Sequence, residues 1–404
     1  MHRFQLILAA VWLAFLPVAA CSSAALANGD MFSGDPVAQQ AWLEKGLMKQ
    51  PLYGFIDKSG HFSINPTYNF AGQFSEKAAL VRAHRTFQYI DPEGKLLFER
   101  DTKGPVTVTP RPFKQGLALT FQPEGCGYVD NSGKFVIAPK YQAAGDFSEG
   151  LAQVCYGAEI GHSTWGFIDK SGKLVIAGPF ESAMGFSNGL AAARKDDRWG
   201  YIDPTGSFVI KPQYLAATDF CENRAAVVTD GLWVYIDKSG KAAFDGSFSY
   251  AMPFSDGIAV VCRDKEGDVY ECIDASGKSI NLSLQPIASC TEGLIRVKDK
   301  NGKFGFADKS GAIVIAPQYE ATLAFAEGLA AVSLDGKWGF IDKSGKMVIK
   351  PAFIDVKPFS EGLAGAAPIP TSASIPTPAS TTTVAPVPTT RGTPLSMRSL
   401  ARSH

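Results

Sequence analysis

A single motif recurs along most of this chain and constrains its fold more than any other feature. Its most regular copy is Lys337–Pro351, with the sequence KWGFIDKSGKMVIKP. Tandem motifs of this length are typical of repeat architectures, in which neighbouring units share one continuous core. Near-copies follow one another at spacings of 34 to 39 residues, and the first motif position is held by Tyr53, Phe87, Cys126, Trp165, Trp199, Trp233, Tyr270, Phe304 and Trp338.

Each copy of the motif predicts a β-meander. Trp-Gly-Phe-Ile-Asp and the later Val-Ile pair are rich in strand formers. The Asp-Lys-Ser-Gly between them is typical of a turn, because Asp and Ser cap backbone groups and Gly accepts a positive φ. A third strand precedes the motif, as in Gly328–Val332, and Asp335-Gly336 then predicts a two-residue hairpin turn. The fold class is therefore all-β, built from tandem three-stranded antiparallel meanders.

The segments between meanders share a second pattern, seen in Pro317–Gly328. We expect its Pro to end the third strand, and its Tyr and Phe to pack between adjacent meanders. Insertions of a few residues between copies fit loops that vary while strands stay constant.

The order of strands favours a closed, propeller-like ring. The first hairpin, from Tyr53, has no clear leading strand, whereas Glu361–Ala364 is a leading strand with no hairpin after it. Pairing the last strand with the first hairpin would complete a unit and remove exposed edges. An open β-superhelix, or solenoid, is the alternative, because nine three-stranded units exceed the usual four to eight four-stranded propeller blades. Glu44–Leu47 is a second candidate for the missing leading strand.

The chain divides into four regions. Residues 1–20 form a predicted signal peptide, and residues 21–50 a lead-in with a short helix that begins at Asp35-Pro36. Residues 51–364 hold the nine repeats. Residues 365–404 are rich in Pro, Thr and Ser, so they cannot bury a core and are predicted to be a disordered tail.

The N-terminus has the pattern of an export signal, with Arg3 before the apolar run Leu6–Val18. This run is too short for a membrane span. Val18-Ala-Ala-Cys21 resembles a bacterial lipobox, in which Cys21 would be lipidated. Ser22, directly after it, resembles the residue at this position in lipoproteins sent to an outer membrane. Cleavage after Ala27 is the alternative. We expect an exported protein, at the periplasmic face of the outer membrane as a lipoprotein, or periplasmic or extracellular if cleaved after Ala27.

Export would allow disulfides among the six remaining cysteines. Cys262 and Cys272 flank a turn and are predicted to face each other across one hairpin. Cys126 and Cys155 lie on strands of consecutive units and form a second candidate pair, which leaves Cys221 and Cys290 by elimination. Burial as small apolar side chains is the alternative. No Cys-x-x-Cys occurs, so a zinc site is not expected.

No residue pattern predicts catalysis, a cofactor or a metal. Gly185–Gly189 matches Gly-x-Ser-x-Gly, but it is the Phe-Ser-Glu-Gly column of the repeat. The three histidines of the array, His61, His84 and His162, share no repeat position. One carboxylate per turn suits calcium poorly, so a turn-capping role is expected for the repeated acids Asp57, Asp91, Asp130, Asp169, Asp203, Asp237, Asp274, Asp308 and Asp342.

The anchor column is expected to be structural. Large rings at this column would pack in the core, and the Gly beside each would allow close backbone approach; a glycan-stacking platform is the alternative. The anchors are Trp165, Gly166, Trp199, Gly200, Trp233, Trp338 and Gly339.

Tyr53 to about Ala364 resembles the WG repeat family of bacterial proteins, named for the Trp-Gly pair. Several copies depart from it, since Gln88, Val234 and Glu271 replace the Gly and Cys126 replaces the Trp. The resemblance implies a non-enzymatic interaction scaffold of the envelope or the extracellular space.

The balanced charge of the chain narrows the classes of partner that are expected. Lys+Arg and Asp+Glu are 39 each, so neither nucleic acid nor an anionic membrane is expected as a bulk electrostatic partner. We therefore expect a non-enzymatic scaffold of the bacterial cell envelope that binds a protein or polysaccharide, with membrane contact only through an N-terminal lipid anchor. The alternatives are an enzyme or enzyme accessory acting on envelope glycans, and a structural spacer.

Overall fold

The computed structural model describes residues 51–84, 86–100, 110–156, 163–264 and 269–370. Cys21, the predicted N-terminal helix, the signal peptide and the tail from residue 371 lie outside the described residues. The chain divides into two units, Met1–Ile369 and Pro370–His404, and all the strands belong to the first. All regular structure in the described part is β, and that part contains no helix long and apolar enough to cross a membrane.

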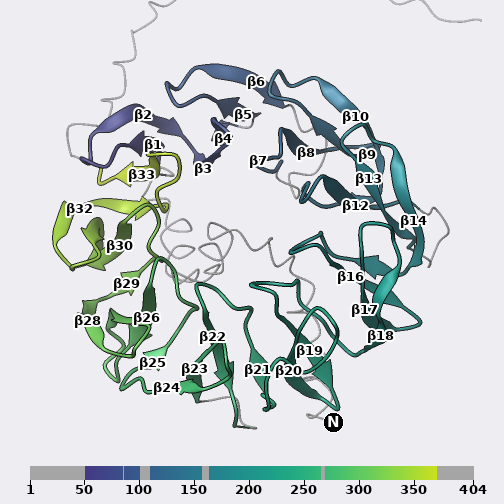
Figure 1. Ribbon diagram of the computed structural model, residues 1–404. Coiled ribbons are helices and arrows are strands. Elements are labelled where there is room, and N and C mark those ends of the chain that lie inside the picture. The colour runs from purple at the N-terminus through teal and green to yellow at the C-terminus, as the bar shows by residue number, and fades with distance from the viewer. Residues whose placement is uncertain (1–50, 85, 101–109, 157–162, 265–268, 371–404) are drawn as a thin grey trace, which may run out of the picture. The chain divides into compact units, whose positions relative to one another are not determined.

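Each repeat folds as a small antiparallel sheet, here called a blade, and the blades follow one another around a ring (Figure 1). Six blades are separate four-stranded sheets. Blades 2 to 4 consist of β3(Phe70–Ser75), β4(Ala78–Ala83), β5(Thr86–Ile90), β6(Leu96–Arg100); β7(Phe113–Lys114), β8(Leu117–Gln122), β9(Gly125–Val129), β10(Phe135–Tyr141); and β11(Ala143–Ala144), β12(Leu151–Cys155), β13(Trp165–Asp169), β14(Leu174–Phe180). Blades 5, 7 and 8 consist of β15(Ser182–Ala183), β16(Ala191–Lys195), β17(Arg198–Ile202), β18(Phe208–Tyr214); β21(Tyr250–Ala251), β22(Ile258–Cys262), β23(Tyr270–Asp274), β24(Ser279–Ile280); and β25(Gln285–Pro286), β26(Leu294–Lys298), β27(Phe304–Asp308), β28(Ile313–Tyr319).

The remaining strands complete the ring. Blade 6 is the pair β19(Ala225–Thr229) and β20(Leu232–Ile236), flanked by isolated bridges at Ala217, Ala242 and Phe248. A seven-stranded sheet holds the last two blades, in the order β2-β1-β33-β32-β31-β30-β29. Blade 9 is β29(Ala321–Thr322), β30(Leu329–Leu334), β31(Lys337–Asp342) and β32(Met347–Val356), and blade 1 is β33(Ala364–Pro368), β1(Tyr53–Ile56) and β2(Phe62–Tyr68). Within the described residues the repeat thus forms nine blades.

The two ends of the array meet within blade 1. Strand β33 pairs with β1, where Ala366 lies opposite Gly54 and Ala364 opposite Ile56. It also pairs with the end of β32, where Ala366 lies opposite Val356. The predicted closed, propeller-like ring is therefore confirmed, with the C-terminal strand completing the first unit. The open superhelix would leave this pairing unmade.

Two details of the predicted meander were wrong. Most blades have four strands and not three, because part of the connecting segment forms an innermost strand such as β29. The motif Pro does not end the third strand of the meander, since Pro351 lies within β32. Phe340 pairs with Ile349 and Trp338 with Phe353, so the extra residues around Pro351 bulge from the outermost strand. Pro is tolerated there because an outer strand leaves its N–H side without a ladder partner.

Aromatic pairs form the centre of the contact between blades. A buried ring from the third strand of one blade meets the ring at the start of the next blade's Phe-Ser-Glu-Gly turn. At eight interfaces the ring centroids are 4.7–5.2 Å apart at 60–67°, an edge-to-face arrangement. The pairs are Phe55–Phe74, Tyr89–Phe113, Tyr128–Phe147, Phe167–Phe186, Tyr201–Phe220, Tyr235–Phe254, Phe306–Phe325 and Phe340–Phe359.

A ring of hydrogen bonds lies beside these aromatic pairs. In the turn Phe147–Gly150, Glu149 and Gly150 both have positive φ (53° and 84°), which defines a type I′ hairpin turn. The side chain at the Glu position accepts a backbone N–H from the same turn in the next blade. The acceptors are Glu76, Gln115, Glu149, Asn188, Glu222, Asp256, Glu292, Glu327 and Glu361, at 2.5–3.1 Å.

The closing interfaces repeat the internal ones. Glu327 of blade 9 accepts from Gly362 N of blade 1 at 3.0 Å, and Glu361 of blade 1 accepts from Lys77 N of blade 2 at 2.9 Å. Near the outside, a Cβ added at Gly60 would lie 2.8 Å from Ile349 Cγ2. The two interfaces that close the ring therefore use the same kinds of contact as the internal ones.

Deleting residues 361–368 tests the closure. The deletion removes β33, which exposes edges of β1 and β32 and opens the inter-blade contacts of blade 1. We expect a clear fall in melting temperature by scanning calorimetry. A truncation after residue 370 keeps β33 and is the matched control. Equal melting temperatures for the two variants would contradict closure by β33.

Candidate functional site

The Asp and Ser side chains of the repeated Asp-Lys-Ser-Gly segment form hydrogen bonds within their own turn. Asp342 Oδ1 accepts from Ser344 N at 2.9 Å, Ser344 Oγ at 2.6 Å and Lys346 N at 3.0 Å. The pKa of Asp342 is lowered, first by the hydroxyl bond from Ser344 and then by the backbone bonds. The other repeat acids accept the same backbone bonds, which confirms the predicted capping role.

The Trp-Gly anchors are structural, although the rings are not fully buried. Trp338 is half-buried and packs against the cluster that contains Phe340 and Phe353, and Trp165, Trp199 and Trp233 are half-buried in the same way. A Cβ added at Gly339 would lie 2.5 Å from Ile349 O and 2.8 Å from Pro351 N. Gly166 and Gly200 face the same kind of crossing backbone. The predicted close approach at Gly is therefore confirmed.

The Gly-x-Ser-x-Gly match serves blade packing. Ser187 is buried, and its Oγ donates to Phe220 O of the next blade at 2.7 Å. Ser148 Oγ donates to Phe186 O in the same way, and Ser360 Oγ to Phe74 O. Ser187 thus has the same role as its counterparts in the repeat. Among the described residues no group of three or more His, Cys, Asp or Glu could hold a metal ion.

The structure does not join the predicted cysteine pairs. Cys126, Cys155, Cys262, Cys272 and Cys290 are buried thiols. Cys262 lies opposite Tyr270 and Cys272 opposite Val260, so these two cysteines do not face each other directly.

The other two predicted pairs differ in their placement. Cys126 Sγ is 3.8 Å from Gln142 O, and Cys155 Sγ is 3.6 Å from Gln142 Oε1, so both thiols lie against one residue. Cys221 belongs to the turn of blade 6 and Cys290 to that of blade 8, with blade 7 between them. No bridge joins any of the three predicted pairs in the structure.

Two acids near the innermost strands were missed in the sequence, the partly exposed Asp146 and the buried Asp219. Each directly precedes the turn Phe, at Asp146 and Asp219. Asp146 Oδ2 lies 3.3 Å from Arg111 of the previous blade. Asp219 is 6% exposed, its Oδ1 has no hydrogen-bond partner in the described part of the chain, and burial raises its pKa to about 7. Met184 holds the position in blade 5 that Arg111 holds in blade 3.

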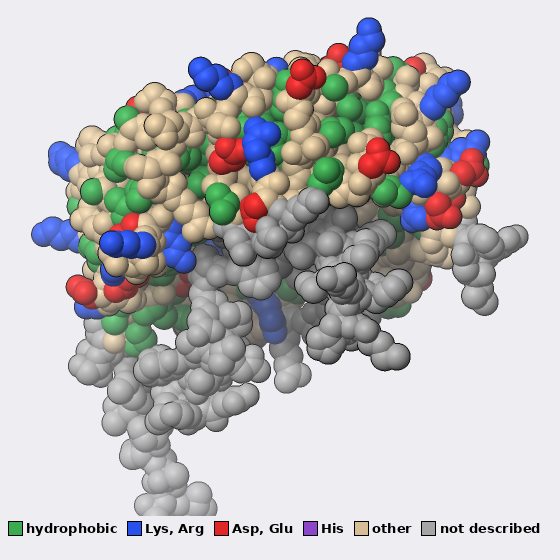
Figure 2. Space-filling model, turned by 90° about the horizontal axis from the view of Figure 1, so that it is seen from below, with side chains coloured by type: hydrophobic (Ala, Val, Ile, Leu, Met, Phe, Trp, Pro, Cys, Tyr) green, Lys and Arg blue, Asp and Glu red, His purple; other side chains and the backbone are tan. Residues whose placement is uncertain are grey.

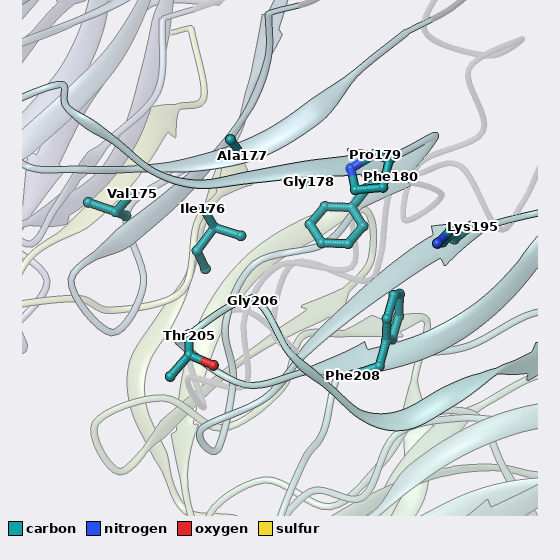
Figure 3. A pocket seen from close by; sticks show the side chains of 10 residues that line it. All are labelled: Val175, Ile176, Ala177, Gly178, Pro179, Phe180, Lys195, Thr205, Gly206 and Phe208. Atoms are coloured by element: carbon teal, nitrogen blue, oxygen red, sulfur yellow. The ribbon is translucent and has the colours of Figure 1, made fainter.

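A surface depression between blades 4 and 5 was also missed (Figure 3). Ala177–Phe180 reads Ala-Gly-Pro-Phe, where the corresponding segment of blade 8 reads Ala-Pro-Gln-Tyr. The Phe180 ring lies against Gly178, where a Cβ would be 2.0 Å from it, and meets Phe208 edge-on at 5.8 Å. Lys195 and Thr205 of blade 5 complete the lining.

This depression coincides with a lost contact of the repeat. Tyr141 OH and Tyr214 OH each lie 3.5 Å from a turn carbonyl of the following blade, those of Gly172 and Gly240. Phe180 has no hydroxyl for the corresponding carbonyl of Gly206. The sequence signals for this site were therefore Pro179, which is one position later than the Pro of the corresponding segments in blades 3 and 5, and Phe180, which replaces their Tyr.

The surface charge is mixed. On the face in Figure 2, Lys and Arg side chains are interspersed with Asp and Glu. Three of the turn acids pair with lysines of the next blade: Asp256 with Lys309 at 2.8 Å, Glu292 with Lys343 at 3.1 Å and Glu327 with Lys58 at 3.2 Å.

The repeat identifies the family. The family model described as "WG containing repeat" matches seven segments, which together cover more than half of the chain: residues 53–83, 127–158, 165–199, 199–233, 235–266, 304–338 and 338–366. This chain belongs to the WG-repeat family. Each matched segment begins in one blade and ends in the next; residues 53–83, for example, hold β1 and β2 of blade 1 and β3 and β4 of blade 2. The WG repeat therefore corresponds to the outer hairpin of one blade followed by the inner strands of the next. A comparison with curated proteins finds no match.

Several solved structures are similar to this WG-repeat protein at low identity. A crystal structure of a eukaryotic initiation factor is 10% identical over 74% of this chain and 95% of that one, with a TM-score of 0.48. Hsv2p of Kluyveromyces lactis is 13% identical over 67% and 95%, with a TM-score of 0.37. The extracellular domain of BT3049 from B. thetaiotaomicron is 12% identical over 70% and 46%, with a TM-score of 0.29. Each TM-score is below 0.5, so the fold rests on the sheet topology alone.

Gly339→Ala tests the close approach at the Trp-Gly pair. The added Cβ has backbone atoms as its nearest neighbours, which cannot move aside without breaking the β31–β32 ladder. We expect a loss of about 1–3 kcal/mol in the free energy of unfolding, typical of overpacking, measured by urea denaturation. Gly185→Ala is the control, because its Cβ would meet only Gln153 Oε1, at 3.6 Å. An equal loss in both variants would contradict the steric explanation.

Asp219→Asn tests the unpaired buried acid. Because its pKa is about 7 in the fold and near 4 in the unfolded chain, only the unfolded state ionises between these values. The resulting penalty is absent below pH 4, grows as pH rises, and is complete above pH 7. We expect the variant to be more stable than wild type at pH 8, with little difference at pH 4, by urea denaturation. Asp146→Asn, which loses the Arg111 contact, should instead destabilise at pH 8.

Proposed function

We propose that this WG-repeat protein is a non-enzymatic scaffold of the bacterial cell envelope whose ring of blades presents a surface to a protein or polysaccharide. The observation that carries this proposal is the use of the repeated polar side chains. Asp binds its own turn, while Ser and the turn acid bind the next blade. Residues committed to these bonds are not available as nucleophiles or bases. The predicted export signal at Leu6–Val18 and the resemblance of Val18–Cys21 to a lipobox support the envelope location.

Recognition then falls to places where a blade departs from the repeat. The depression between blades 4 and 5 combines the half-buried Phe208 ring and exposed Val175 with the Lys195 ammonium at its rim. An apolar surface with a few polar groups at its edge is the usual form of a binding site. A sugar ring or apolar side chain that carries an acidic group would match this arrangement.

The depression can be tested by charge changes at its exposed rim. Val175→Asp combined with Lys195→Glu reverses the local charge and places a carboxylate on the apolar wall. We expect this double variant to lose the partner that wild type retains from solubilised bacterial envelope extracts. Val348→Asp combined with Lys350→Glu is the control, because Val348 holds the same repeat position in blade 9 with similar exposure (41% against 43%).

The outcomes separate the parts of the proposal. Retention by both variants would place binding elsewhere on the ring. Wild-type protein that retains neither protein nor polysaccharide would contradict the scaffold function, and turnover of envelope glycans by the purified chain would contradict its non-enzymatic character.

A further inference from the structure

The interface between blades 7 and 8 lacks the aromatic pair found at the other eight. Cys272 of β23 holds the position of Phe340, and Cys290 holds the position of Phe359 in the turn. Both are fully buried, at 0% exposure, in one cluster with Ile258, Val260 and residues of blade 8. Both members of a contacting pair are thus replaced, and both by the one residue type that can form a side-chain covalent bond with itself.

The polar contacts of the turn acid are kept between blades 7 and 8, so the positions of Cys272 and Cys290 face each other as the aromatic positions do elsewhere. Asp256 of blade 7 accepts from Gly293 N of blade 8 and pairs with Lys309, also of blade 8. These are the contacts that accompany an aromatic pair elsewhere, as at Glu327 and Gly362. Cys290 Sγ also lies 3.6 Å from Asp256 Oδ2, so its thiol points toward blade 7.

The outer part of the same interface also departs from the repeat. At six other interfaces an Ile side chain of the outer strand lies nearest the turn Gly of the next blade, as Ile349 does at Gly60, and at the remaining two a Phe takes this place. In blade 7 the outer strand β24 has only two residues, and a Cβ added at Gly311 of blade 8 would lie 2.4 Å from Asn281 O and 3.3 Å from Ile280 Cγ2. At this interface a backbone carbonyl is nearest the turn Gly, and in the middle layer two thiols take the place of two aromatic rings. A disulfide needs small side chains at such a contact, because its Cα–Cα span is short.

We propose that Cys272 and Cys290 form a disulfide that links blades 7 and 8 in place of the aromatic pair. The structure shows the dithiol state. An oxidant of the disulfide class, such as oxidised glutathione, converts it. The two thiols lose two protons and two electrons and gain one S–S bond, while one glutathione disulfide becomes two thiols.

We expect the disulfide to form during folding, before its two thiols are buried. In the folded dithiol, burial raises the pKa of both Cys272 and Cys290 to about 12. Thiolates, which carry out the exchange, are then scarce at neutral pH. The bridge therefore forms before blades 7 and 8 close, and reduced, folded protein reacts slowly with added disulfide.

Peptide mapping tests the bridge. The full-length chain is refolded at pH 8 with oxidised and reduced glutathione, alkylated in denaturant and digested without reduction. We expect a peptide that joins Cys272 to Cys290, released by dithiothreitol, and a melting temperature several degrees lower after reduction. Alkylation of both residues, or a bridge from either to another cysteine such as Cys262, would overturn the proposal.

A repeat-based variant supplies the control. Cys272→Phe combined with Cys290→Phe restores the pair of the other interfaces, so its melting temperature should not change with dithiothreitol. If wild type and this variant respond equally to reductant, the stabilising bridge lies elsewhere. The mapping of wild-type protein decides the pairing even where the variant does not fold.

Discussion

The edge-to-face aromatic contact between consecutive blades is the interaction on which the rest of this structure depends. A four-stranded sheet from one repeat has two faces and cannot bury both by itself. Each fully buried Phe or Tyr contributes about 1.5–3 kcal/mol, and the edge-to-face arrangement adds about 0.5–1.5 kcal/mol. The neighbouring turn acids are partly exposed, and their ion pairs with lysine are worth at most about 1 kcal/mol. Apolar burial therefore holds the blades together, and the hydrogen bonds set their alignment.

Closure follows from this dependence. A linear array would leave one apolar face uncovered at each end, with edge strands open to pairing. Here β33 lies between β1 and β32, so blade 1 combines strands from both ends of the repeat region. Phe340–Phe359 and Phe55–Phe74 then have the same geometry as the internal pairs, both at 4.9 Å. The ring needs no special closing device, because the contacts that join successive repeats also join the last to the first.

The sequence was informative where chemistry is local. Asp-Lys-Ser-Gly predicted its turn because Asp342 needs only residues two and four positions ahead, and the strand count predicted closure through Ala364. Most innermost strands were missed because they are two residues long and unalike, as Gln285–Pro286 and Ala321–Thr322 show. Pairing of Cys262 was misjudged because register places Tyr270 opposite it. Asp219 and the depression at Phe180 were missed because they depend on neighbours from another blade.

The repeat also gives each interface an internal reference, which separates structural from functional residues without any other sequence. A side chain that does the same work in nearly every blade, as Ser148 and Ser187 do, is explained by packing. Packing does not explain a buried acid such as Asp219, whose Oδ1 has no hydrogen-bond partner in the described part of the chain and whose pKa is raised by burial. The departures lie at different interfaces: Phe180 between blades 4 and 5, Asp219 between 5 and 6, and Cys290 between 7 and 8. Because the remaining contacts of the ring still hold each of these interfaces, the frame can accept such local losses, and binding can evolve there without changing the fold.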